Sequence, residues 1–191
     1  MSLEESRLIE KIIAGEKPAF SELVNAYKNK VYNTALGYLQ NPEDAEDIAQ
    51  EVFIEIFRSI ETFKGESSLS TWIYRISVTK SLELIRKRKR KKRFAIVKDI
   101  FSGSNENFEP VDFIHPGIIM ENKERSALLF KKINRLPDKQ KTAFILNKVE
   151  GLSYKEISKI MNLSQSAVES IIFRAKENLK KYLKLYYINK I

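Results

Sequence analysis

The chain has 191 residues and a net charge of +9, and 43% of its residues are hydrophobic, enough for one domain or two small ones. It has no cysteine and a single histidine, His115, which excludes disulfides, thiolate chemistry and cysteine zinc sites, and neither a metal nor a cofactor is expected. The N-terminus does not resemble a signal peptide, and no apolar run approaches the roughly 20 residues that span a bilayer. The composition therefore predicts a cytoplasmic protein with no membrane insertion.

Hydrophobic residues recur with helical periodicity along most of the chain, and no run alternates in the manner of a strand. A short first helix is expected to end at Gly15, and a second to open at Pro18. Asn41 and Pro42 supply a cap and a first-turn proline for a third helix, and a fourth begins near Ser70. The residues predicted to face the core are Leu8, Ile9, Ile12 and Ile13 in the first helix, Phe20, Leu23, Val24, Tyr27, Val31, Ala35 and Leu39 in the second, Ala45, Ile48, Ala49, Val52, Phe53, Ile56, Phe57 and Ile60 in the third, and Trp72, Ile73, Ile76, Val78, Leu82 and Ile85 in the fourth.

Periodicity is lost between residues 94 and 120, where prolines, glycines and polar residues are mixed with isolated apolar ones. This composition predicts a partly ordered linker. Helical periodicity resumes at residues 121–134 and again after Pro137. The expected fold class is therefore all-α, with two small helical domains at residues 1–93 and 121–191 joined by a linker at residues 94–120.

Positive charge is concentrated in eight consecutive cations, Arg86–Arg93, and the rest of the chain is close to neutral. This basic run directly follows a loop and helix that carry Phe63, Trp72 and Tyr74. Aromatic rings can stack on unpaired bases, and neighbouring cations can follow a phosphate backbone. The segment therefore indicates binding of single-stranded or melting nucleic acid. A solvated helix end would also carry such a run, and Trp72 is expected to be at least half structural.

A helix-turn-helix is predicted near the C-terminus. Ser153 and Glu156 form a capping box for its first helix, and Asn162 tolerates the left-handed backbone of a tight turn. Ser164 then opens a second helix with its inner stripe at Val168, Ile172, Ala175 and Leu179, and with Gln165, Ser166, Glu169, Ser170, Phe173 and Arg174 facing outward. Small, polar and charged groups near the N-terminus of the second helix are typical of a DNA recognition helix. Arg174 and Lys176 suit phosphate or guanine, and Glu169 could accept a hydrogen bond from a cytosine amine.

The third helix carries an acidic face opposite its core stripe. Asp47 and Glu51 lie on this face together with an exposed apolar residue, Ile54. Acidic residues repel DNA, so this face favours a basic protein partner instead. The carboxylates of the first turn, by contrast, are explained by their preference for a helix N-terminus.

Taken together, these segments resemble the extracytoplasmic-function (ECF) sigma factors, group 4 of the sigma-70 family of bacterial RNA polymerase specificity subunits. The matching segments are residues 20–24, 44–53 and 71–76 in the first domain and residues 136–137, 152–157 and 170–176 in the second. Their order and spacing along nearly the whole chain make the resemblance specific.

The resemblance implies that the first domain docks on the clamp of the polymerase β′ subunit and captures the −10 promoter element as it melts, with a flipped base held in the loop at residues 63–70. It implies that the second domain reads the −35 element as duplex DNA and contacts the β flap with its other face, and that an anti-sigma factor is a further partner. The candidate polymerase-binding residues are Asp47, Gln50, Glu51, Phe53 and Ile54. The candidate −10 residues are Phe63, Ser67, Leu69, Trp72, Arg75, Thr79, Lys80, Arg86, Lys87 and Arg90. The candidate −35 residues are Gln165, Ser166, Glu169, Ser170, Phe173, Arg174 and Lys176.

Three positions depart from the family pattern. Thr79 stands where many relatives carry asparagine, and Glu169 and Ile171 stand where basic residues are common. The last two predict fewer cationic contacts with the −35 element and a different base preference there.

Two other classes of function are compatible with parts of the sequence. A free-standing helix-turn-helix regulator would share the C-terminal motif but would have no use for the acidic face. An enzyme would need converging carboxylates or histidines, which the pattern does not supply, so no catalytic residue is expected. A polymerase subunit should also bind DNA poorly in isolation, until core polymerase separates its two domains.

Overall fold

The computed structural model describes residues 2–99 and 123–188, and all of its regular elements in these ranges are helical. The all-α prediction is therefore confirmed. Residues 100–122, which hold most of the predicted linker and His115, lie outside the described residues. The elements are α1 (Leu3–Ile13), α2 (Lys17–Leu39), α3 (Pro42–Ser59), η1 (Ile60–Thr62), α4 (Leu69–Asp99), α5 (Lys123–Ile133), α6 (Asp138–Phe144), the π-helical turn η2 (Ile145–Val149), α7 (Tyr154–Met161) and α8 (Gln165–Ile188).

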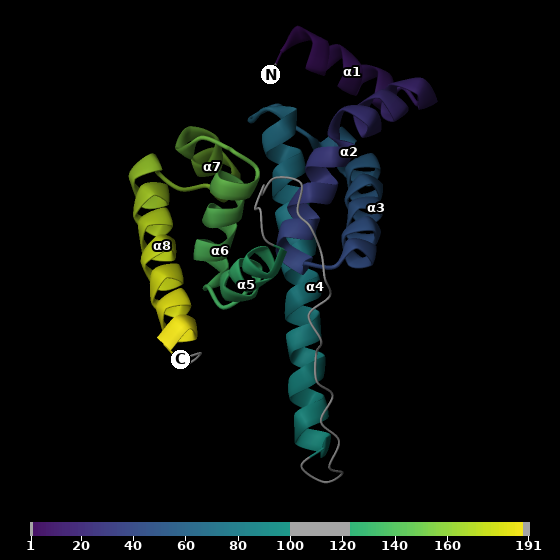
Figure 1. Ribbon diagram of the computed structural model, residues 1–191. Helices are drawn as coiled ribbons and strands as arrows, with labels where there is room; N and C mark the ends of the chain where they lie inside the picture. The colour runs from purple at the N-terminus through teal and green to yellow at the C-terminus, as the bar shows by residue number, and fades with distance from the viewer. Residues whose placement is uncertain (1, 100–122, 189–191) are drawn as a thin grey trace.

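The first domain consists of α1–α4, with α2, α3 and α4 packed against one another and α1 at one end (Figure 1). Local sequence signals set its helix ends. Gly15 adopts φ 85°, which ends α1 and turns the chain into α2. The Asn41 side chain accepts a hydrogen bond from the Asp44 amide, as the predicted cap of α3. An additional capping box between Ser2 and Glu5 starts α1.

Helix α4 continues through the whole basic run and ends at Asp99, six residues beyond the predicted end of the first domain. Its last turns extend past the other helices (Figure 1). The prolines and glycines that weaken the helical pattern come only after this point. The basic residues are therefore displayed along a helix rather than on a flexible tail.

The second domain consists of α5–α8. The capping box predicted between Ser153 and Glu156 begins α7, and Asn162 ends it in the left-handed region at φ 53°. The Ser164 hydroxyl accepts a hydrogen bond from the Ala167 amide at the start of α8. The predicted inner stripe of α8 is buried at all four positions: Val168, Ile172, Ala175 and Leu179. The helix-turn-helix is therefore confirmed at the level of its local geometry.

The two domains pack directly on each other, α4 against α7 and α2 against η2 (Figure 1). Tyr74 of α4 belongs to a buried cluster that otherwise comes from the second domain, including Ile157 and Ile172. A second cluster joins residues of α2 and α3 to Phe130 and Ile145. The interface is therefore an extension of both hydrophobic cores.

Two residues predicted to lie in the core are exposed instead. Ile13, the last residue of α1, is 47% exposed, and Phe57 of α3 is 59% exposed. The neighbouring Ile12 and Ile56 take the buried positions. In both cases two apolar residues are adjacent on a helix, and hydrophobicity alone does not tell which of the two faces the core.

Candidate docking and nucleic-acid interface

The outward face of α3 combines acidic and apolar side chains. Asp47, Gln50 and Glu51 lie on it and are exposed, Phe53 is half-buried, and Ile54 is 50% exposed. Phe57 continues the same face one turn further on and packs edge-to-face on Phe20, with 5.1 Å between ring centroids. Because Phe57 follows Ile54 at a three-residue step, the helical spacing could have identified it as part of this face rather than of the core. An exposed stripe of this kind is suited to a basic protein surface.

The loop before α4 is fixed by its own contacts. The rings of Phe63 and Trp72 lie 5.0 Å apart at an interplanar angle of 39°, and both are half-buried. The Ser68 hydroxyl accepts a hydrogen bond from the Thr71 amide and so caps the start of α4. Ser67 is half-buried in the same loop. Leu69, a predicted DNA contact, has no exposed surface in this structure, and its apolar side chain anchors α4 in the core.

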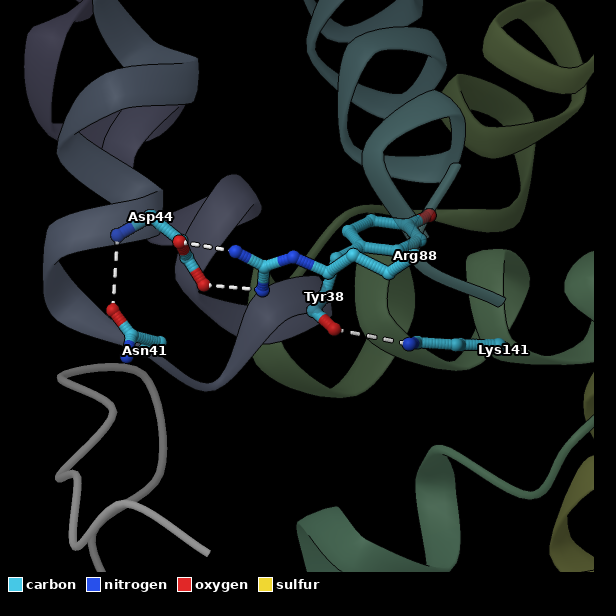
Figure 2. Close-up of polar contacts among 5 residues, drawn as sticks. All are labelled: Tyr38, Asn41, Asp44, Arg88 and Lys141. Atoms are coloured by element: carbon cyan, nitrogen blue, oxygen red, sulfur yellow. Dashed lines mark hydrogen bonds and ion pairs between the residues drawn. The ribbon is translucent and has the colours of Figure 1, made fainter. Parts of the chain in front are cut away.

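The cations of α4 have different surroundings. Lys80 pairs with Glu55 at 3.2 Å, and Arg86 pairs with Asp138 of the second domain at 2.9 Å. Arg88 donates two hydrogen bonds of 2.6 Å to Asp44 (Figure 2). These hydrogen bonds raise the pKa of Arg88 above its ordinary value. Lys80, Arg86 and Arg88 are therefore held by carboxylates of the protein. Thr79, Lys87 and Arg90 have exposed side chains on the same helix.

Arg75, in the first half of α4, meets the second domain. Its guanidinium donates to the carbonyl of Lys159 at 2.6 Å and to that of Ile160 at 3.3 Å. It therefore caps the C-terminal end of α7. This contact joins a predicted −10 residue to the helix-turn-helix across the domain interface.

The outward face of α8 is accessible along its length. Gln165, Ser166, Glu169, Ser170, Phe173, Arg174 and Lys176 are all exposed. Phe173 is 65% exposed, and it lines a shallow hollow with Glu169, Ser170 and Arg174. Ile171 is buried, so the side chain at this departure from the family pattern belongs to the core. The structure thus brings the seven predicted −35 residues onto one exposed surface.

A metal site needs a group of ligating side chains, and a membrane span needs a long apolar helix. No group of three histidine, cysteine or carboxylate side chains that could hold a metal ion occurs among the described residues. Within residues 2–99 and 123–188, no helix has the length and apolar character needed to cross a membrane.

Comparison with known proteins gives consistent matches to both domains. The family model for Sigma-70 region 2 matches residues 23–91, and the model for Sigma-70 region 4 matches residues 126–179. The ECF RNA polymerase sigma-E factor of Haemophilus influenzae is 36% identical over 182 residues, which cover 93% of this chain and 94% of that protein. The ECF RNA polymerase sigma factor SigW of Bacillus subtilis is 31% identical over 188 residues, covering 96% and 99%.

Two solved structures share the fold. CnrH, in complex with the cytosolic domain of CnrY, gives a TM-score of 0.66 at 21% identity and covers 95% of this chain and 97% of that one. The sigma factor RpoE of Bartonella quintana, in complex with the anti-sigma factor NepR, gives a TM-score of 0.63 at 23% identity and covers 86% and 96%. At these identities the likeness supports the arrangement of helices.

Proposed function

Because this chain belongs to the ECF family of RNA polymerase sigma factors, we propose that α3 binds core polymerase and that α4 and α8 hold the −10 and −35 promoter elements. Sigma factors are transcription initiation factors without enzymatic activity of their own. This assignment is supported by three separate exposed surfaces. The surface on α3 is acidic and apolar, and the surfaces proposed for DNA lie on α4 and α8.

For polymerase binding, we propose that Asp47, Gln50 and Glu51 meet a basic surface of the β′ clamp while Phe53 and Ile54 supply apolar contact. Charged groups at the edge of such an interface speed association, and a central apolar group provides much of the affinity. Phe57 is added to this set because it is exposed on the same face.

For the −10 element, the pair of Phe63 and Trp72 offers ring surface beside Ser67, and α4 offers Thr79 and a row of cations including Lys87 and Arg90. Stacking on aromatic rings suits unpaired bases, and cations suit the backbone between them. Arg75, Lys80 and Arg86 belong to the same set, although each is engaged within the protein in this structure.

For the −35 element, the exposed face of α8 would enter the major groove. Arg174 and Lys176 can contact guanine or phosphate, Phe173 can contact a thymine methyl, and Glu169 can accept from a cytosine amine. Selection of binding sites from randomised upstream elements would test this: a Glu169→Gln variant should relax the preference at one base pair. An unchanged preference would remove Glu169 from the set.

The resemblance to the family predicts two further partners. The face of the second domain opposite the α8 surface would contact the β flap of core polymerase, and an anti-sigma factor would hold the protein inactive. The site of action would be the bacterial cytoplasm, where core polymerase meets promoter DNA.

The central experiment is reconstitution with bacterial core polymerase. The chain should co-elute with core polymerase and start transcripts at selected promoters in genomic DNA. Asp47→Lys should abolish co-elution, because it reverses a charge of the proposed docking face and sets it against a basic surface of the partner.

Glu46→Lys provides the matched control, because Glu46 is a carboxylate on the same helix outside the docking set. It should assemble normally. If Asp47→Lys still forms holoenzyme, the docking assignment is wrong. If the unaltered chain starts no site-selective transcript, the proposed function is wrong.

A further inference from the structure

The C-terminal part of α4 projects beyond the helices that pack around its first half (Figure 1). The family model for Sigma-70 region 2 ends at residue 91, whereas α4 continues to Asp99. Arg93 lies on this extension, outside both family matches. The projecting end is therefore a feature of this chain rather than of the matched domains.

The projecting end carries accessible cations. Lys91 and Arg93 are exposed, and neither forms an ion pair with another described residue. Lys91 follows the exposed Lys87 by four residues, and Arg93 follows the exposed Arg90 by three, so the members of each pair are neighbours on the helix surface. Like charges at these steps repel one another, and an anion bound along the row would relieve the repulsion.

The length of α4 indicates which DNA this end meets. From Trp72 of the proposed −10 site to Arg93 the helix rises about 30 Å, which is the length of roughly nine base pairs of duplex. Trp72 is assigned to melting DNA, so Arg93 reaches DNA that is still paired. The chain continues from α4 to the second domain, which is assigned to the upstream −35 element. This end of α4 therefore points at the DNA between the two elements.

The exposed face of α8 gives a reason for a contact there. Glu169 lies on this face, and Ile171, at a position where relatives often carry a basic residue, is buried. A carboxylate on the −35 face repels phosphate, so α8 gains less affinity from the DNA backbone than a more basic helix would. Cations that neutralise phosphates elsewhere on the promoter would offset this loss.

We propose that the projecting end of α4, at Lys91 and Arg93, binds the phosphate backbone of the duplex between the −10 and −35 elements. The proposal rests on the proposed function, because it takes α4 and α8 as the helices that hold the two elements. Phosphate contacts carry no sequence information directly, so this one adds affinity whatever the sequence of the spacer. It also steepens the salt dependence of binding, because each neutralised phosphate releases counterions.

The contact can be measured first in the isolated full chain on duplex DNA of random sequence, because it needs no promoter. The test variant carries Lys91→Gln and Arg93→Gln together. Its slope of log K against log salt concentration should be shallower than that of the unaltered chain by about 1.8, since each duplex phosphate contributes about 0.9. The matched control carries Lys11→Gln and Lys17→Gln, at exposed lysines of α1 and α2, and so has the same net charge. It should keep the original slope.

DNA with a neutral backbone then locates the contact in the holoenzyme. On a promoter fragment with methylphosphonate linkages throughout the spacer, the unaltered holoenzyme should bind with a shallower salt slope, and the test variant should reduce the slope no further. With the same linkages placed upstream of the −35 element instead, the test variant should again reduce the slope by about 1.8.

Each outcome bears on a different claim. If the test variant leaves the slope of the isolated chain unchanged, the inference is wrong. If it reduces the slope equally on both promoter fragments, the contact lies outside the spacer and the location is wrong. If it weakens assembly with core polymerase without changing the salt slope, the surface binds polymerase and the inference is again wrong. Failure of the proposed function would appear separately, as an absence of site-selective transcription by the unaltered chain with core polymerase, and would not alter the result on random-sequence duplex.

Discussion

Arg88 and Arg90 stand two residues apart in the basic run, but only Arg88 is tied to a carboxylate across the first domain. Its two hydrogen bonds to Asp44 connect the basic part of α4 to the first turn of α3 (Figure 2). Asp44 is itself held by the Asn41 cap. Arg88 therefore has a structural role, whereas the exposed Arg90 is available to phosphate.

We expect Arg88→Ala to lower the thermal midpoint of unfolding by about 2–4 °C, since an ion pair this exposed to solvent contributes about 1 kcal/mol or less even in bidentate geometry. Arg90→Ala should leave the midpoint unchanged. In promoter binding by the holoenzyme, Arg90→Ala should instead reduce the steepness of the salt dependence by about 0.7 for each phosphate that is no longer neutralised. Thermal unfolding and a salt titration measure the two effects, and an equal loss of stability in both variants would contradict the distinction.

The sequence could not reveal these pairings. A run of eight cations predicts a phosphate-binding surface, but which of them is paired depends on carboxylates more than 40 positions away, such as Asp44 and Asp138. Arg75 is the sharpest case. Its sequence context indicates DNA, whereas in the closed structure its partners are backbone carbonyls of the other domain.

At the scale of the element, α3 has two apolar faces with different roles. Ile56 is fully buried in the core, while the adjacent Phe57 is exposed and contacts Phe20. An ordinary amphipathic helix would place a polar side chain where Phe57 stands. The proposed contact with polymerase explains why the exposed face of α3 carries an apolar side chain.

We expect Phe57→Ala to weaken binding to core polymerase about tenfold or more, the effect typical of an aromatic anchor, while lowering stability by no more than about 1 kcal/mol. Ile56→Ala should destabilise the fold by about 2–5 kcal/mol, because it leaves a cavity in the core. Ile13→Ala, at an exposed apolar residue of α1, is the control and should bind normally. Titration of labelled protein with core polymerase, together with denaturant unfolding, would test this; normal binding by Phe57→Ala would remove Phe57 from the docking face.

Elements with strong local signals could be predicted well. The caps at Asn41 and Ser153, the left-handed turn at Asn162 and the inner stripe of α8 all follow from short-range chemistry. Helices α2 and α4 were harder, because each packs on two sides. Tyr38 and Tyr74 belong to the domain interface, and periodicity indicates which residues are apolar without indicating which surface they meet.

At the scale of the whole molecule, closure of the two domains on each other places two ionisable side chains in low-dielectric surroundings. Lys141 lies beside Tyr38 and Asn134, with Lys89 and Asp138 nearby; Glu150 lies near Tyr74, Thr34 and Lys30. Because the first domain covers both groups, their ordinary pKa values should return when the domains separate. Closure is therefore coupled to pH at two points with opposite sign.

The pKa of Lys141 falls from 10.5 to about 7 on closure, so closing releases a proton between these values and is favoured as pH rises through that window. The pKa of Glu150 rises from 4.5 to about 7, so closing takes up a proton and is favoured as pH falls from 7 toward 4.5. Both groups oppose closure most strongly near pH 7, where each would be charged in water. We therefore expect the efficiency of energy transfer between dyes on cysteines introduced at the exposed residues Glu22 of α2 and Lys181 of α8 to pass through a minimum near neutral pH.

Two variants assign the two limbs of this profile. Glu150→Gln should remove the rise on the acid side, and Lys141→Met, which keeps the length of the side chain, should remove the rise on the alkaline side. Far-ultraviolet circular dichroism across the same pH range separates domain opening, which keeps the helices, from unfolding, which loses them. A flat profile in the unaltered chain would mean that the two domains do not enclose these groups in solution, and a profile unchanged by both variants would assign the coupling to other residues.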